Sequence, residues 1–92
     1  MIYRRTRRFM KSFVQLPAHI QEKAINAFEL FRENRRHPSL VVKKMEGKDD
    51  IWEGRVDDKY RFVFRYDYDP IRETPVCVFL NIGPHDILNE QY

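Results

Sequence analysis

Two arginines that face each other across a predicted hairpin are the first residues whose types and spacing could do chemistry. If residues 57–59 form a three-residue loop, Arg55 lies opposite Arg61, and Glu53 follows on the same face. Like charges at directly opposed strand positions repel each other, so the arrangement favours an anion between them. A phosphate could accept hydrogen bonds from both guanidinium groups. The alternative is that both side chains extend into water and that Glu53 screens them.

Polarity selects this register of the hairpin. It places one apolar set on a single face: Trp52, Val56, Tyr60, Phe62 and Phe64. The opposite face then carries Glu53, Arg55, Arg61 and Arg65, with Ile51 and Val63 between them. A two-residue loop would set Arg55 opposite Phe62 and mix polar with apolar side chains, which disfavours that register.

His85 is the second candidate for chemistry. It follows Gly83-Pro84 at the end of a predicted strand, where a turn can aim a side chain. An imidazole titrates near neutral pH and suits general acid or base catalysis. Asp86 could orient the imidazole or cap the following turn. The alternative is an exposed loop histidine with no chemical role.

Other catalytic and cofactor signatures are missing from the sequence. Three scattered histidines and one cysteine show no zinc-ligand spacing. There is no glycine-rich phosphate loop, nucleophile elbow or dinucleotide fingerprint. We therefore expect neither a metal nor a cofactor, and we expect Cys77 to be a buried, inert thiol.

The pattern along the first forty residues predicts a short strand and two helices. Residues 2–6 read as a strand, and Phe9, Phe13 and Leu16 share one helical face before Pro17. The second helix carries its apolar side chains at helical spacing: Ile20, Ala24, Ala27, Phe28 and Phe31. His37-Pro38 is expected to end it, because the residue before a proline avoids helical geometry.

Four strands are predicted to follow, over residues 40–45, 51–56, 60–66 and 76–82. Residues 67–75 contain two prolines and several acids and read as a loop, while residues 85–92 form a mostly polar tail. Strands joined by short connections pair antiparallel. The predicted fold class is therefore α+β, with a short N-terminal strand, two helices and a largely antiparallel four-stranded sheet whose one face the helices cover.

Length and composition predict a single domain over residues 1–92 with a modest core. The chain is 42% hydrophobic and 34% charged, with apolar residues along its whole length, which excludes a disordered tail. No apolar stretch approaches the roughly 20 residues of a membrane span. Residues 1–10 hold four arginines and no apolar signal region. With one cysteine and no export signal, a reducing cytoplasm is expected.

Charge is distributed unevenly between the two halves of the chain. Up to Lys48 there are twelve basic and four acidic residues, a net charge of +8, whereas residues 49–92 carry five basic and ten acidic ones, a net charge of −5. A basic half suggests a polyanionic partner or an acidic protein that covers it. The alternative is a solvated surface of uneven charge.

Four segments, in the same order and spacing, resemble the RelE/ParE superfamily of toxins. They are residues 34–47 (NRRHPSLVVKKMEG), 51–56 (IWEGRV), 60–64 (YRFVF) and 82–88 (IGPHDIL). The likeness spans nearly the whole chain, including Leu16-Pro17 between the predicted helices. It implies a compact α+β toxin of a type II toxin–antitoxin pair, in which an antitoxin covers the basic surface.

The resemblance also implies roles for individual residues. Basic strand residues contact phosphate in RelE-type toxins, and Lys43, Lys44, Arg55 and Arg61 match such places, with Arg65 on the same face expected to bind RNA. Glu53 resembles the carboxylate base of YoeB-like members, and His85 the C-terminal histidine of YafQ-like ones. The chain departs from the pattern at Pro84, where relatives have Thr or Arg, in the long acidic segment 67–75, and at Tyr92 as the counterpart of a C-terminal aromatic residue.

The expected activity is metal-independent cleavage of mRNA at the ribosome. Glu53 or His85 would remove the proton of an RNA 2′-hydroxyl, and the arginines would stabilise the charge that develops on the phosphate. Two alternatives remain open within the superfamily. One is a ParE-like inhibitor of DNA gyrase without catalysis, and the other is a non-toxic relative that only binds an antitoxin.

Overall fold

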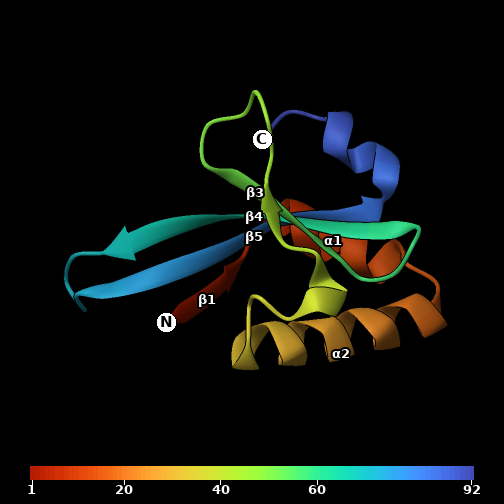
Figure 1. Ribbon diagram of the computed structural model, residues 1–92, viewed down its shortest axis with the longest axis horizontal. Coiled ribbons are helices and arrows are strands. Elements are labelled where there is room, and N and C mark those ends of the chain that lie inside the picture. The colour runs from red at the N-terminus through yellow and green to blue at the C-terminus, as the bar shows by residue number, and fades with distance from the viewer.

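The computed structural model describes all 92 residues, and they form nine elements joined by turns and loops (Figure 1). They are β1 (Ile2–Arg5), α1 (Arg7–Gln15), α2 (Ala18–Glu33), the 3₁₀ helix η1 (Pro38–Leu40), β2 (Lys43–Lys44), β3 (Ile51–Arg55), β4 (Tyr60–Asp69), β5 (Thr74–Pro84) and the 3₁₀ helix η2 (His85–Asn89). Neither α-helix is long and apolar enough to cross a bilayer.

The five strands form one mixed sheet in the order β1-β5-β4-β3-β2. β1 pairs parallel with β5, from Ile2 opposite Val76 onward, and the other pairs are antiparallel. The predicted α+β class and the largely antiparallel sheet are therefore confirmed, with the N-terminal strand added at one edge.

An aromatic core joins the helices to one face of the sheet. Thr6 caps α1 by accepting a hydrogen bond from the Phe9 amide, and the apolar stripe of α2 is buried as its spacing predicts. Phe31 packs edge-on against Phe62 and Phe64 of β4, with ring centroids 5.7 and 5.1 Å apart. In Figure 1, α2 runs along this side of the sheet.

The backbone of the β3–β4 hairpin packs closely against this core at Gly54. Gly54 lies opposite Phe62, and a Cβ atom at position 54 would lie only 2.2 Å from the Phe62 ring. A glycine is therefore required there, because any side chain would displace a ring at the centre of the core.

A second, smaller apolar cluster lies on the other face of the sheet. Strand residues Ile51, Val63, Val78 and Leu80 pack there with Ile87 of η2. The mostly polar tail predicted for residues 85–92 therefore contains a helical turn that covers part of this face, and Figure 1 shows it on the side opposite α2. Apolar side chains at Ile87 and Leu88 explain why the segment folds back.

The predicted loop over residues 67–75 is wrong. β4 continues to Asp69 and β5 begins at Thr74, so only a tight turn separates them. Asp69 Oδ1 accepts hydrogen bonds from the amides of Ile71 and Arg72 and closes that turn. Pro75 is tolerated in β5 because it precedes Val76, the first residue that pairs with β1.

Two further boundaries differ from the prediction. The expected strand over residues 40–45 shortens to β2, because η1 precedes it and Val41 adopts a left-handed φ of 44°. α2 ends at Glu33, before His37-Pro38, since Asn34 leaves helical geometry and its Oδ1 accepts a hydrogen bond from the Arg36 amide.

Candidate nucleic-acid interface on the β3–β4 hairpin

The hairpin brings the two arginines together as its polarity predicts. Arg55 pairs with Arg61, Glu53 with Val63 and Trp52 with Phe64, which confirms the predicted register. Opposed residues of an antiparallel pair point to the same side, so Arg55 and Arg61 share the sheet face that carries Glu53. This is the face away from α2, because Trp52 and Phe64 pack in the aromatic core.

Arg61 has a second role that the sequence did not reveal. Its side chain lies against the β3–β4 turn with the residue only 5% exposed, and Nη1 donates to the carbonyl oxygens of Asp57 (2.7 Å), Asp58 (3.1 Å) and Tyr60 (3.1 Å). The turn geometry directs these carbonyls inward, and a guanidinium is well suited to several such acceptors. Arg61 therefore fixes the turn that holds Arg55 opposite it.

Arg55 is the more accessible of the two cations. Its side chain is 42% exposed, and its nearest carboxylate is the exposed Asp58, at an Nη1–Oδ1 distance of 4.0 Å. Burial, followed by the charge of Arg55, lowers the pKa of Arg61, although Glu53 acts in the opposite direction. The two guanidinium groups thus destabilise each other, and a bound anion would relieve that repulsion.

His85 lies at the same end of the sheet. Its backbone amide donates to the Lys59 carbonyl at 2.8 Å, and Gly83, two residues earlier, pairs with Arg61. The imidazole is exposed and forms no hydrogen bond with Glu53, Arg55 or Asp86. The backbone therefore brings His85 near the arginine pair, while its side chain has no protein partner.

The basic residues assigned to RNA binding divide between the faces. Lys43 pairs with Glu53 and so lies on the arginine face, whereas Lys44 pairs with Trp52 on the other side and contacts Asp50 at 3.7 Å. Arg65 pairs with Ile51, is exposed, and shares the arginine face. A shallow pocket of about 540 Å³ lies between the β2–β3 segment and η2 and is lined by Lys43, Lys44, Met45, Glu46, Lys48, Glu53, Leu88 and Asn89.

A partly buried polar network around Asn81 is a further feature that the sequence pattern does not predict. Asn81 Oδ1 accepts from Ser12 Oγ at 2.6 Å, and Asn81 Nδ2 donates to the Tyr92 hydroxyl at 3.1 Å. That hydroxyl donates to the Ile87 carbonyl at 2.7 Å, which ties η2 to β5. Burial raises the pKa of Tyr92. A single asparagine between Leu80 and Ile82 was the signal available.

Side chains suited to other chemistry are dispersed. No group of three or more His, Cys, Asp or Glu residues is arranged to hold a metal ion. Cys77 is buried in β5, and burial raises the pKa of its thiol to about 12. At neutral pH it is therefore a protonated and unreactive thiol.

Comparison with solved structures identifies the architecture. The YoeB/ParE toxin from Agrobacterium tumefaciens superposes with a TM-score of 0.72 over 92% of this chain and 99% of its own, at 15% identity. YafQ from Escherichia coli superposes with a TM-score of 0.74 over 96% and 97%, at 10% identity. This chain has the RelE/ParE-like toxin fold.

A chain from an antitoxin–toxin complex is also similar in structure to this chain. A chain of the RelB–RelE antitoxin–toxin complex from Methanococcus jannaschii superposes with a TM-score of 0.67 over 97% of this chain and 95% of its own, at 16% identity. No protein-family model and no curated protein sequence matches the chain. The RelE-like fold is thus established by backbone geometry, and the functions of its side chains have to be argued from their own surroundings.

Proposed function

We propose that this chain is the toxin of a type II toxin–antitoxin pair and cleaves mRNA at the ribosome as a metal-independent endoribonuclease in the cytoplasm. The likeness of its backbone to RelE, YafQ and YoeB/ParE toxins supports the first part. The observation that carries the second part is the opposition of Arg55 and Arg61 on the sheet face that carries Glu53, where the Arg55 side chain is accessible. Two close cations with one carboxylate form a site for a phosphodiester.

The chemistry requires a base, an acid and a charge clamp. Glu53 or His85 removes the proton from an RNA 2′-hydroxyl, and the oxygen attacks the adjacent phosphorus as the bond to the 5′-oxygen breaks. His85, or another acid where His85 is the base, donates a proton to that leaving oxygen, giving a 2′,3′-cyclic phosphate and a 5′-hydroxyl. General acid–base catalysis contributes roughly 10²–10⁴-fold. Arg55 and Arg61 stabilise the phosphorane charge, worth about 10²–10³-fold per donor in comparable sites.

The surrounding basic residues extend this site along an RNA strand. Lys43 and Arg65 lie on the arginine face on either side of Glu53, and Lys44 borders the adjacent pocket. The N-terminal half of the chain adds a net charge of +8, which attracts the ribosome's RNA in a salt-dependent manner. An antitoxin with acidic segments would compete for the same surface, as suits a toxin's inhibitory partner.

The decisive test is primer extension on cellular mRNA after a short pulse of expression. Wild type should produce ribosome-dependent cuts, and Arg55→Gln and Glu53→Gln should each reduce them about 100-fold. Arg55 is the better probe than Arg61, because Arg61 also holds the turn. Arg72→Gln is the matched control, since this exposed arginine lies in the distant β4–β5 turn.

The other possible outcomes of this experiment would each assign a different function to the chain. Growth arrest without mRNA cuts, equal in wild type and Arg55→Gln, would contradict catalysis and support the gyrase-inhibiting alternative. Expression that leaves growth and translation unchanged would instead identify a non-toxic, antitoxin-binding relative. Cleavage of an all-DNA strand would contradict the 2′-hydroxyl chemistry.

A further inference from the structure

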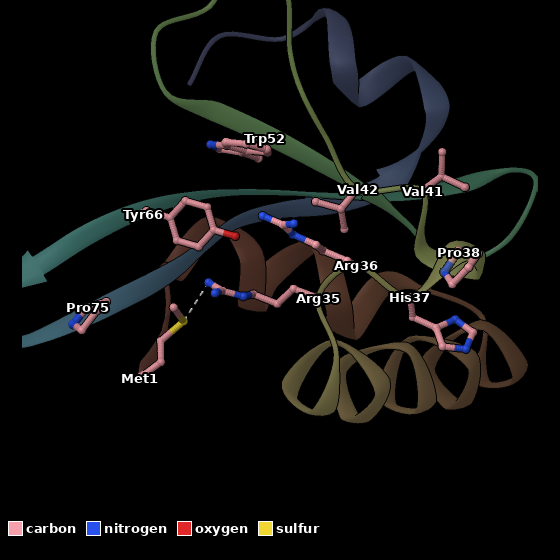
Figure 2. Close-up of a pocket in the computed structure, with 10 residues that line it drawn as sticks. All are labelled: Met1, Arg35, Arg36, His37, Pro38, Val41, Val42, Trp52, Tyr66 and Pro75. Atoms are coloured by element: carbon pink, nitrogen blue, oxygen red, sulfur yellow. Dashed lines mark hydrogen bonds between the residues drawn. The ribbon is translucent and has the colours of Figure 1, made fainter.

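A second pocket lies on the helix side of the sheet, beyond the end of α2, and the arginine pair plays no part in it. Figure 2 shows the residues around it, which come from the segment after α2, from β3 to β5 and from the start of the chain. Its volume is about 640 Å³ and its lining is Met1, Arg35, Arg36, His37, Pro38, Val41, Val42, Trp52, Tyr66 and Pro75. The lining contains two arginines and no acidic residue, so the pocket is electropositive.

Both arginines lack a carboxylate partner. Arg35 Nη1 donates to the Met1 sulfur at 3.6 Å, and its guanidinium lies over the Tyr66 ring at 5.3 Å. No ion pair or side-chain hydrogen bond involves the Arg36 guanidinium. In Figure 2 both groups extend from the segment after α2 toward Tyr66. Two unneutralised guanidinium groups on consecutive residues supply the planar sets of donors that phosphate recognition uses.

The local backbone explains why consecutive arginines both reach the pocket. Asn34 ends α2, and its Oδ1 accepts from the Arg36 amide, which forms a tight turn. The next residue, His37, turns away in Figure 2, and its Nδ1 accepts from the Ser39 amide at 3.2 Å. The turn therefore presents two cations, while the imidazole beside them is engaged in capping η1.

Two aromatic rings form the wall opposite the arginines. Trp52 stacks on buried Phe64 and meets Tyr66 edge-on, with centroids 6.4 and 5.6 Å apart. Packing on Phe64 restricts the motion of the Trp52 indole, and the Arg35 guanidinium covers one face of the Tyr66 ring. Rigid aromatic surfaces next to cations are the components of a base-stacking site.

We propose that this pocket binds a nucleotide, with its base against Trp52 or Tyr66 and its phosphate on Arg35 and Arg36. Its volume lies within the range of about 300–1,000 Å³ that is typical of small-molecule sites. The nucleotide can be a free nucleoside phosphate or one residue of an RNA strand. Because Trp52 and Glu53 are consecutive in β3, the pocket lies on the sheet face opposite the arginine pair. The proposal therefore does not depend on catalysis.

Trp52 provides the measurement, since it is the only tryptophan in the chain. Adenosine 5′-monophosphate should change its fluorescence in a saturable manner, with excitation at wavelengths that the base does not absorb. Arg35→Gln and Arg36→Gln should each weaken binding about tenfold or more, as expected for the loss of a charge-assisted hydrogen bond. Arg7→Gln on α1 removes the same charge from a residue outside the lining of this pocket and should have no effect. Circular dichroism checks that each variant is folded.

Parallel titrations separate the possible occupants. Adenosine alone and inorganic phosphate alone should bind at least about tenfold more weakly than the nucleotide, because each uses half of the site. A short single-stranded RNA that binds more tightly than the mononucleotide, with the same arginine dependence, identifies an RNA strand as the source; a stronger response to the mononucleotide identifies a free nucleotide. No saturable response, a response that Arg7→Gln weakens equally, or a response only to an acidic peptide would overturn the proposal. mRNA cleavage by the same variants tests the catalytic face separately.

Discussion

At the scale of single residues, the two arginines of the pair differ in what surrounds them. Arg61 is buried and donates to three carbonyl oxygens, whereas the Arg55 side chain is partly exposed, with one carboxylate 4.0 Å away. A buried guanidinium that satisfies several acceptors stabilises the fold, and an exposed ion pair contributes little. Arg61 thus adds a structural role, through Nη1, to its place in the pair, whereas Arg55 is the more accessible cation for an anion.

We predict that Arg61→Gln lowers the free energy of unfolding by about 1.5–3 kcal/mol, because three carbonyl oxygens lose a charged donor. Arg55→Gln should change it by less than about 0.5 kcal/mol. Urea denaturation followed by circular dichroism measures both. Equal losses in the two variants would show that Arg61 does not anchor the turn.

Polarity was sufficient to predict which strand residues share a face. The strict alternation around Phe62 and Phe64 left one register that kept the arginines away from the core, and the structure has that register. The destination of the Arg61 side chain was not predictable, because it depends on where the turn directs its carbonyl oxygens. The opposite orientations of Lys43 and Lys44 follow from strand alternation once β2 is known.

At the scale of elements, the β3–β4 turn is held by a carboxylate as well as by Arg61. Asp57 Oδ1 accepts from the amides of Lys59 (3.0 Å) and Tyr60 (2.9 Å), and Oδ2 lies 3.4 Å from Lys23 of α2. Burial acts to raise the pKa of Asp57, but these hydrogen bonds and the lysine outweigh it, so the pKa is lowered. The turn and α2 are therefore linked through one ionised side chain.

We predict that Asp57→Ala costs about 1–2 kcal/mol of folding free energy at neutral pH, as expected for loss of a capping acceptor. A lowered pKa means that the ionised form is favoured in the folded state. Its contribution is therefore complete above the ordinary Asp value of 3.8 and is lost as the pH falls through the lower folded value. Asp57→Asn keeps an oxygen that can accept hydrogen bonds from the Lys59 and Tyr60 amides, so it should lose only the pH-dependent part of the stabilisation. Urea denaturation measures the folding free energy of wild type and Asp57→Asn at each pH. The same difference between them above and below this pH window would contradict the role assigned to the ionised Asp57.

Element boundaries were predictable where apolar spacing sets them and not where side chains cap turns. The stripe of α2 identified the helix, but its end depends on Asn34 rather than on Pro38. Residues 67–75 looked like a loop because prolines and acids suggest turns. In the structure the acids lie at or beside a short turn, and Pro75 pairs with Tyr68 of β4 but precedes the residues that pair with β1, so both are compatible with a long hairpin.

At the scale of the whole molecule, two apolar layers lie on either side of one sheet, and Tyr92 connects the smaller layer to its surroundings. The Tyr92 hydroxyl bridges Asn81 of β5 and Ile87 of η2. Its ring lies beneath the guanidinium of Arg8 from α1, 4.6 Å away, and near Lys48 from the β2–β3 segment, 5.6 Å away. Four segments thus meet at one side chain, two of them, at Arg8 and Lys48, far from it in sequence, and η2, which begins with His85, depends on them.

Removing that hydroxyl tests whether these contacts hold the layer in place. We predict that Tyr92→Phe lowers the free energy of unfolding by about 1–3 kcal/mol, because the buried Asn81 amide loses its acceptor. The Glu90 amide, which donates to the Ile87 carbonyl, should exchange its hydrogen faster as η2 loosens. Tyr68→Phe is the matched control, since Tyr68 is 56% exposed and its hydroxyl has no partner, and it should change stability by less than about 0.5 kcal/mol. Equal stability and equal exchange in the two variants would mean that η2 is held by its apolar contacts at Ile87 alone, and that the position of His85 is independent of Tyr92.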